Sequence, residues 1–186
     1  AGELSATQQW KPLIEVQERK LATIEDEIEA ASVRYEIAKV WDECVDDVER
    51  AIVEYRAALD SNPAEVRALK ALEHLYAETE KFGELVDIYE QQALLAVNDE
   101  SSVEMWLRIA SLKQEKMEDL EGASAALIKA LEADPSHLPT VKRLEEVWRL
   151  SQDYASLAEA LERHLKIVGD EHEESTEVYL ALGDVC

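Results

Sequence analysis

An all-α solenoid of stacked antiparallel helix pairs is the fold that this sequence predicts, and three observations predict it. The 186 residues include only 5 glycines and 4 prolines, so turns must be few and short. Alanine, leucine and glutamate are abundant, and these residues are strong helix formers. Similar segments recur along the chain at one fixed offset, as in repeat proteins whose helices stack along one direction. No alternating run of β-branched residues indicates a strand.

The repeat offset is clearest at two turn sequences. Residues 58–63 (Ala-Leu-Asp-Ser-Asn-Pro) match residues 130–135 (Ala-Leu-Glu-Ala-Asp-Pro). Trp10, Phe82 and Tyr154 are aromatic residues at the same offset. The chain therefore carries a 72-residue unit.

Turn signals near positions 26, 63, 98, 135 and 170 divide each unit into two halves of similar length. Each half suits two helices of about 14 residues, which are marginally stable alone and must stack. We expect one domain over residues 1–186, a fragment of a longer array. Its boundaries are a partial repeat at 1–28, repeats at 29–63, 64–100, 101–135 and 136–172, and a partial repeat at 173–186. Leu4, whose counterpart at the repeat offset is Tyr76, is expected late in a first helix.

Apolar residues at helical spacing indicate the individual helices. One such stripe is Val48, Ala51, Ile52, Tyr55 and Leu59. Three others are Val66, Leu69, Leu72 and Tyr76; Leu120, Ala123, Leu127 and Leu131; and Leu138, Val141, Leu144 and Trp148.

Capping residues predict where helices begin. Asn62, followed by Pro63 and Glu65, predicts a helix that starts at the proline. Ser101 with Glu104 predicts a capping box.

Residues 48–63 and 120–135 each contain a small residue, a bulky one, a second small residue and a final proline. This pattern resembles the second helix of the tetratricopeptide repeat. Leu69, Leu72 and Tyr76 fit the first helix of that family, although Glu73 replaces its glycine. The resemblance implies a right-handed superhelix of antiparallel helix pairs. It also implies a protein-interaction scaffold rather than an enzyme.

Charge and composition disfavour several classes of partner. The 42 acidic and 19 basic residues give a net charge of −23. Such a chain repels nucleic-acid phosphates and anionic membrane surfaces. It contains no apolar stretch of about 20 residues that could span a membrane. Its two cysteines form no disulfide framework, and a cytoplasmic location is the default expectation.

No local signature of catalysis, cofactor binding or metal binding is present. His74, His137, His164 and His172 are dispersed, and none belongs to a zinc-binding helix motif. Cys44 is interpreted as a thiol without a catalytic partner. We therefore expect no enzymatic activity, no cofactor and no metal.

The resemblance implies that the first helices line a concave groove in which partners bind. The candidate partner-binding residues on these helices are Tyr35, Lys39, Arg67, Lys70, His74, Arg108, Lys142, Arg143 and Arg149. Most are basic within an acidic protein, which suits an acidic peptide. The alternative is an ordinary solvated helix surface. Some family members bind a C-terminal carboxylate with lysines and asparagines, but His74 and Glu146 replace the asparagines here.

The tryptophans divide into two groups. Trp10, Trp106 and Trp148 lie in apolar stripes and are expected in the core. Trp41 has Lys113 as its counterpart, so we expect it to be exposed and a candidate contact residue.

A second interpretation of the chain's function remains open. The fragment could be an architectural spacer, or could self-associate through its truncated ends. Any catalysis would then lie elsewhere in a larger protein.

Overall fold

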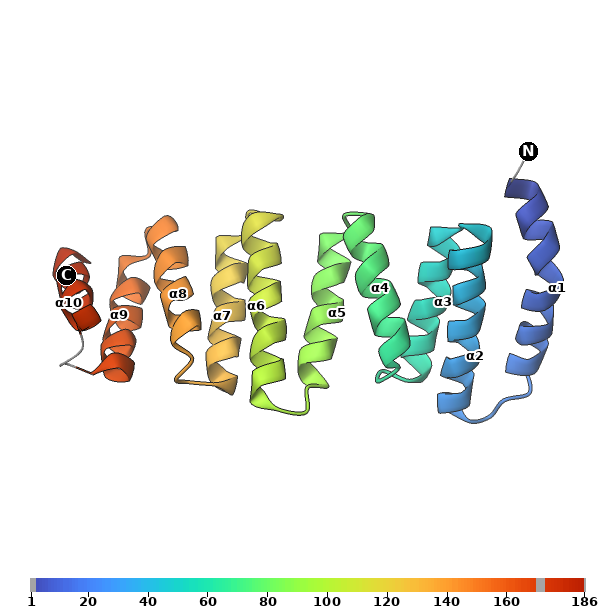
Figure 1. The fold of residues 1–186 in the computed structure, drawn as a ribbon, viewed down its shortest axis with the longest axis horizontal. Coiled ribbons are helices and arrows are strands. Elements are labelled where there is room, and N and C mark those ends of the chain that lie inside the picture. The colour runs from blue at the N-terminus through green and yellow to red at the C-terminus, as the bar shows by residue number, and fades with distance from the viewer. Residues whose placement is uncertain (1–2, 170–172, 186) are drawn as a thin grey trace. The chain divides into compact units, whose positions relative to one another are not determined.

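The computed structural model describes residues 3–169 and 173–185 of the chain. It divides into two compact units, Ala1–Ile88 and Tyr89–Cys186. Every regular element in the described part is a helix. The predicted all-α solenoid of antiparallel helix pairs is therefore confirmed, and each unit stacks its own helices (Figure 1).

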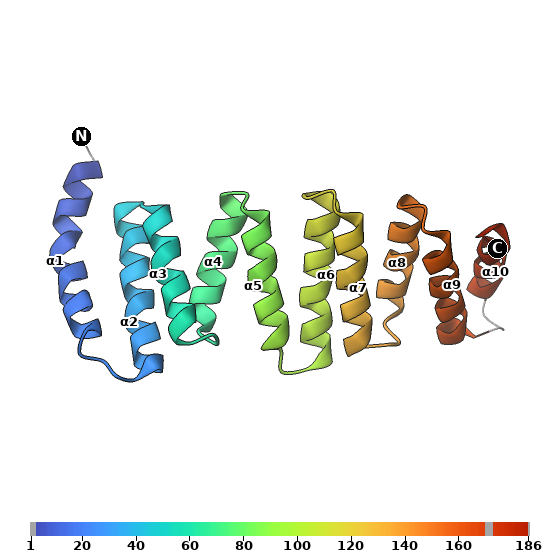
Figure 2. The same ribbon diagram turned by 180° about the vertical axis from the view of Figure 1, so that it is seen from behind.

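The first unit contains α1 (Glu3–Leu21), α2 (Glu27–Lys39), the π-helical turn η1 (Val40–Val45), α3 (Val48–Ser61) and α4 (Val66–Glu78). It also contains the start of α5 (Phe82–Leu94). Helix α2 packs on α3, α3 packs on α4, and α1 contacts both α2 and η1. The pairing of α2 with α3 is visible from behind in Figure 2.

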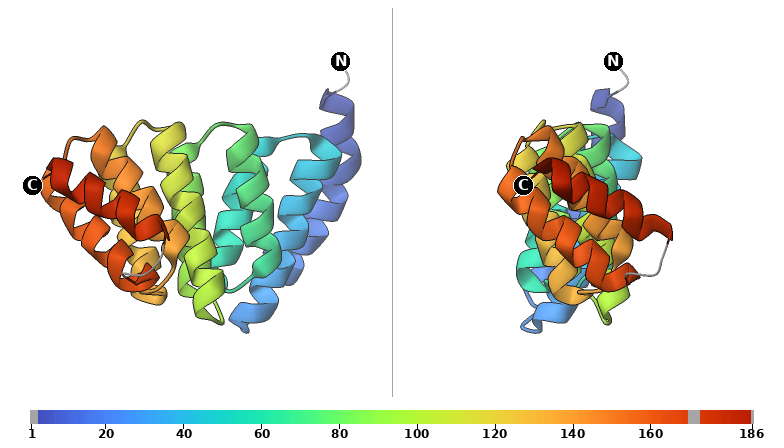
Figure 3. Two further views of the ribbon diagram at one scale, coloured as in Figure 1. Left: turned by 60° about the vertical axis from the view of Figure 1, so that its left-hand side comes forward. Right: turned by 90° about the vertical axis from the view of Figure 1, so that its left-hand side faces the viewer.

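The second unit contains the end of α5, α6 (Asp99–Glu115), α7 (Leu120–Ala133), α8 (Leu138–Leu150), α9 (Tyr154–Val168) and α10 (Glu173–Val185). Each helix from α6 onward packs on the next one, and α10 lies against α9 (Figure 3).

Small and large residues alternate in the buried faces at the 72-residue offset. Ala51 and Ala123 are both fully buried, which allows the paired helices to approach closely. Leu72 and Leu144 are also buried at equivalent positions. The expected stripes are thus largely in the core, but Val66 is exposed because it begins α4 at the edge of the pair.

The turns within the helix pairs follow the same period. Asp46 and Glu118 have φ values of 62° and 54°, and Glu80 and Gln152 have 54° and 59°. These are left-handed conformations that non-glycine residues seldom adopt. The four turns are therefore alike in pairs related by the repeat offset.

Two of the predicted caps were placed wrongly. Helix α6 begins at Asp99, and Asn98 rather than Ser101 is its cap, accepting a 2.8 Å bond from the Ser101 amide. Helix α4 begins at Val66, because Asn62 accepts from the Ala64 amide at 3.1 Å and forms a local turn instead.

The break expected after Leu4 is absent. Helix α1 continues from Glu3 to Leu21, whereas the repeat predicts a turn at 7–9, the counterpart of the turn at 79–81. The segment lacks the left-handed residue that follows α4 at Glu80. Leu4 therefore lies in the same helix as Trp10.

The expectation that Trp41 is exposed was also wrong. Its side chain is 9% exposed, and the Arg50 guanidinium lies 4.5 Å from the centre of its ring. The inference failed because its counterpart Lys113 is itself half-buried, with its ammonium 3.5 Å from Asp119. A lysine can bury its aliphatic stem at such a position, so it does not indicate an exposed site.

The three other tryptophans are less uniformly buried than expected. Trp106 lies in the core, whereas Trp10 and Trp148 are half-buried. Trp148 packs against the cluster of α9 and α10 that includes Leu161 and Val178.

Candidate partner-binding surface

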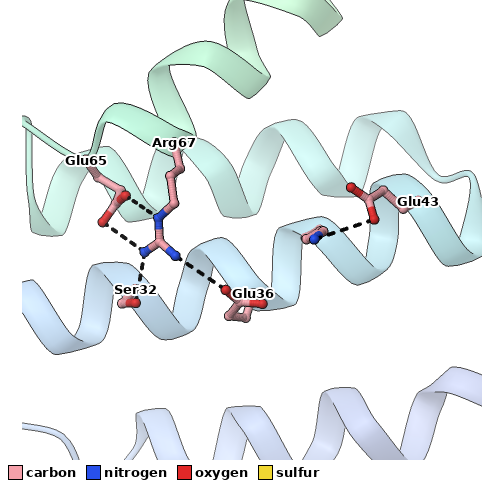
Figure 4. A network of polar contacts seen from close by, with 6 residues as sticks. Ser32, Glu36, Glu43, Glu65 and Arg67 are labelled. Atoms are coloured by element: carbon pink, nitrogen blue, oxygen red, sulfur yellow. Dashed lines mark hydrogen bonds and ion pairs between the residues drawn. The ribbon is translucent and has the colours of Figure 1, made fainter.

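In the first unit, Arg67 joins two first helices. Its Nε donates to Glu65 Oε1 at 2.8 Å, and its Nη2 donates to Ser32 Oγ at 3.0 Å (Figure 4). Its Nη1 lies 3.5 Å from Glu36 Oε1, and its guanidinium carbon lies 4.4 Å from the centre of the Tyr35 ring. These contacts fix a side chain of α4 against α2.

The charges of this network stabilise each other. The hydrogen bond from Arg67 lowers the pKa of Glu65, and the same bond raises the pKa of Arg67. Both groups are therefore ionised over a wide pH range. The guanidinium is almost half exposed, so the ion pair alone contributes little to folding.

The other candidates of the first unit lie along the surfaces of α2 and α4. Lys39 Nζ lies 3.7 Å from Glu43 Oε2, one helical turn further along the chain. His74 Nδ1 lies 3.3 Å from Glu78 Oε2, and Lys70 is exposed. The structure thus brings Tyr35 and Arg67 together, whereas the remaining three are distributed along the helices.

In the second unit, Arg108 lies beside a shallow cleft. Its Nη2 donates to Glu104 Oε1 at 2.8 Å, and its guanidinium carbon lies 5.8 Å from the centre of the Tyr89 ring. The cleft measures about 330 Å³, and its lining residues are Tyr89, Arg108, Ser111, Leu112, Glu115 and Lys116.

Arg143 connects α8 to α6. Its Nη1 donates to the Leu107 carbonyl at 3.4 Å, and its Nη2 donates to Gln114 Oε1 at 3.3 Å. The same nitrogen lies 4.0 Å from Glu115 Oε1. These contacts hold α8 against α6.

Lys142 and Arg149 line one cleft of about 300 Å³ between α8, α9 and α10. Glu145, His164 and Glu177 lie in the same cleft, so its charge is mixed.

Sequence analysis missed His164. Its ring is only 3% exposed, and its Nδ1 lies 2.7 Å from Glu145 Oε1. The helical spacing of His164 from Leu157 and Leu161 could have indicated its burial, because all three lie on the buried face of α9.

A larger cleft of about 720 Å³ was also missed. It lies where the start of α6 meets the connection between α7 and α8. The residues that line it are Asp99, Glu100, Val103, Glu104, Leu107, Ala133, Asp134, Pro135 and His137. Four are acidic, and four others are apolar. Asp134 accepts from the Ser136 hydroxyl at 2.8 Å and from its amide at 2.9 Å, and these bonds lower the pKa of Asp134.

Metal clusters and membrane-spanning helices are both absent from the described part of the chain. Within residues 3–169 and 173–185, no group of three or more His, Cys, Asp or Glu side chains is arranged to hold a metal ion. No helix in these ranges combines the length and apolar character needed to cross a membrane.

Several solved structures resemble the chain. The MamA protein is 17% identical, with a TM-score of 0.46, over 83% of this chain and 80% of that one. A tetratricopeptide repeat protein from Parabacteroides merdae is 16% identical, with a TM-score of 0.47, over 84% and 60%. PilF from Pseudomonas aeruginosa is 14% identical, with a TM-score of 0.45, over 100% and 86%.

No protein-family model matches the chain, and no curated protein matches it. Its own architecture provides the assignment. The helix pairs recur at the 72-residue offset, with Ala51 and Ala123 buried where two helices meet and with matching left-handed turns. The chain is an all-α repeat protein of antiparallel helix pairs, and its repeat resembles the tetratricopeptide pattern.

Proposed function

We propose that this chain is a protein-interaction scaffold that binds a partner protein or peptide on its first helices. One observation carries the proposal. Arg108, Lys142 and Arg149, which the sequence placed on first helices, line clefts of the second unit in the structure. Charged side chains around a concave site can attract and orient a partner segment of opposite charge. The cytoplasmic location expected from the sequence belongs to the same proposal.

The nine candidate residues favour a partner segment that carries carboxylates, although much of their charge is locally offset. Arg67, Lys39, Arg108 and Arg143 each lie within 4.0 Å of a glutamate. Lys70 in the first unit is the basic candidate best placed to attract an acidic peptide.

Peptide selection followed by charge reversal tests the proposal. A random peptide library is selected on the immobilised chain, and the Kd of each selected peptide is measured by fluorescence anisotropy. Lys70→Glu and Lys142→Glu, made separately, should each weaken binding of acidic peptides by about two- to fivefold, because exposed charge pairs contribute little individually.

The matched controls are Lys11→Glu on α1 and Lys166→Glu on α9, which change the net charge equally but lie off the first helices. Circular dichroism verifies that each variant remains folded. If the library yields no specific peptide, the scaffold proposal is wrong. If the control variants weaken binding as much as the first-helix variants, the peptide senses only the overall charge.

A self-association module is the second candidate function. Leu180 and Tyr179 are exposed on α10, at 68% and 49%. Exposed apolar side chains that form a contiguous patch can mark an interface. Sedimentation velocity should then show dimers that Leu180→Glu dissociates, whereas a monomer at all concentrations removes this alternative.

A further inference from the structure

The acidic cleft of the second unit and the Arg67 network of the first unit occupy the same place in their repeats. Each lies between the first half of one first helix and the beginning of the next first helix. The cleft residues Glu104 and Leu107 are the counterparts, at the 72-residue offset, of Ser32 and Tyr35, the two α2 residues that contact Arg67. The repeat therefore allows one site to serve as a reference for the other.

The two sites differ at the position of Arg67, which is a proline in the second unit. In the first unit, the Arg67 side chain crosses from α4 to α2 and occupies the space (Figure 4). Its counterpart at the repeat offset is Pro139, in the first turn of α8, whose ring cannot extend across the gap. The corresponding space in the second unit is an open cleft of about 720 Å³.

The negative charge of the open cleft suits a guanidinium, which is the group that Arg67 places at the equivalent site of the first unit. Asp99, Glu100, Glu104 and Asp134 line it, and Asp134 is held in place by Ser136. Arg108 pairs with Glu104 at 2.8 Å without lining the cleft. His137 does line it, and its Nδ1 lies 2.7 Å from Thr140 Oγ1.

The cleft also has apolar lining residues, which add a second element of recognition. These residues are Val103, Leu107, Ala133 and Pro135. Leu107 stands where Tyr35 contacts the arginine of the first unit. An aliphatic arginine stem can pack on such a surface while its guanidinium remains among carboxylates.

We propose that this cleft binds an arginine side chain from a segment of a partner protein, in the place that Arg67 occupies in the first unit. The guanidinium contacts Glu104 and Asp134, and the stem lies on Leu107 and Pro135. The inference rests on the proposed scaffold function and extends it, because it names a basic residue of the partner. None of the nine candidate residues lines this cleft, although Arg108 pairs with its lining residue Glu104.

A defined peptide tests the inference on the purified chain. The probe is a capped pentapeptide with a central arginine between two leucines, and its control contains citrulline, which has nearly the same shape but no charge. Titration is followed by NMR of the ¹⁵N-labelled chain. The arginine peptide should shift the amides that line the cleft and bind about tenfold more tightly than the citrulline peptide. Its affinity should fall as salt is added.

Substitution of Pro139 provides the sharper test. Pro139→Arg restores the residue of the first unit and should block the cleft, lowering the affinity for the arginine peptide by about tenfold. Pro139→Ala removes the ring without filling the space, and its affinity should stay close to that of the wild type. Glu104→Gln combined with Asp134→Asn should also weaken binding about tenfold while preserving shape.

The inference is overturned if the citrulline peptide binds as tightly as the arginine peptide, or if Pro139→Arg binds like Pro139→Ala. If Pro139→Arg does not fold, the Glu104→Gln and Asp134→Asn variant decides the matter. A chain that binds selected acidic peptides but not the arginine peptide retains the scaffold function and loses this inference. If the chain binds the arginine peptide but Lys70→Glu and Lys142→Glu do not weaken the binding of acidic peptides, the arginine cleft is supported. The proposed role of the first-helix lysines is then lost.

Discussion

In the first unit an arginine of α4 lies against α2, whereas in the second unit an open acidic cleft lies between α6 and the connection from α7 to α8. Both units use the same buried alanines and leucines to pair their helices. The difference shows that a few small and apolar positions maintain the repeat, which leaves its surface free to change. The replacement of Arg67 by Pro139 is one of several differences between the two sites, and it removes the side chain that reaches α2 in the first unit.

The cores of the two units differ in a second respect, which concerns ionisable groups. Tyr55 and Tyr76 are buried in the first unit, and burial raises the pKa of each phenol. Their counterparts in the second unit are Leu127 and Trp148, which cannot ionise. Tyr55 and Tyr76 should therefore make the core of the first unit more sensitive to alkaline pH than Leu127 and Trp148 make the core of the second.

The largest effect should come from enlarging the buried alanines that both units share. Ala51→Leu and Ala123→Leu insert a larger side chain where the space around each alanine is already full. Each should lower the free energy of unfolding by about 1–3 kcal/mol, because overpacking strains the surrounding core. Urea denaturation followed by circular dichroism measures the loss.

The exposed positions Glu49 and Glu121 are controls, since Glu49→Leu and Glu121→Leu should change stability little. If only one alanine substitution destabilises the chain, the two units do not share the same scaffold, and the comparison between them fails.

Alkaline pH should separate the two units next. The folded-state pKa values of Tyr55 and Tyr76 lie above the usual value of 10.0. Their contribution is complete below pH 10 and is lost as the pH rises toward the folded-state values. Each buried phenol should then reduce the free energy of unfolding by at most about 1.4 kcal/mol per pH unit above 10.

Denaturation curves between pH 8 and about pH 11.5 test this for the wild type and for the Tyr55→Phe, Tyr76→Phe double variant. The variant should lose less stability in this range. Tyr55→Phe also removes the 3.3 Å bond to Asp42, so the variants are compared by slope rather than by absolute stability. Equal slopes would show that the phenols ionise freely in the folded chain.

Substitution of Arg67 should have a smaller effect on the free energy of unfolding, and this effect should change at acidic rather than alkaline pH. Arg67→Ala removes the bonds to Glu65 and Ser32 and the contact with Tyr35, and should cost about 1 kcal/mol at pH 7. The folded-state pKa of Glu65 lies below its usual 4.5. The contribution of the pair is therefore present above pH 4.5 and is lost as the pH falls through the folded-state value.

A double-mutant cycle with Glu65→Gln, measured by urea denaturation at pH 7 and pH 3, isolates this term. Pro139→Ala in the second unit is the matched control, because no ion pair is removed there. A coupling energy that is the same at both pH values would contradict the assignment to an ion pair.

The repeat period and the buried stripes could be predicted because they depend on spacing alone. Ala51, Leu72, Ala123 and Leu144 were placed in the core from periodicity, and all are buried. The helix starts were less accurate. Asn62 can cap a helix or form a local turn with the same side chain, and the choice depends on the residues that follow it in space.

The candidate surface was harder to predict because charge pairing is a tertiary property. Nothing in the sequence indicates that Arg67 contacts Ser32 and Glu36, which precede it by 35 and 31 residues. A signal for the open cleft did exist. Comparing Arg67 with Pro139 at the 72-residue offset would have shown that a long side chain is missing from the second unit.

The smallest effect should appear at the left-handed turns, where the two units agree. Glu118 has a φ of 54° and an exposed side chain, so Glu118→Gly relieves strain without removing a buried contact. The free energy of unfolding should rise by about 0.5 kcal/mol, since the greater entropy of an unfolded glycine offsets part of the gain. Lys116→Gly, two residues earlier at a φ of −107°, should instead lower it. Asp46→Gly should behave like Glu118→Gly, because the turn recurs at the 72-residue offset. Thermal denaturation measures all three variants, and a lower Tm for Glu118→Gly would show that its side chain stabilises the turn more than its backbone strains it.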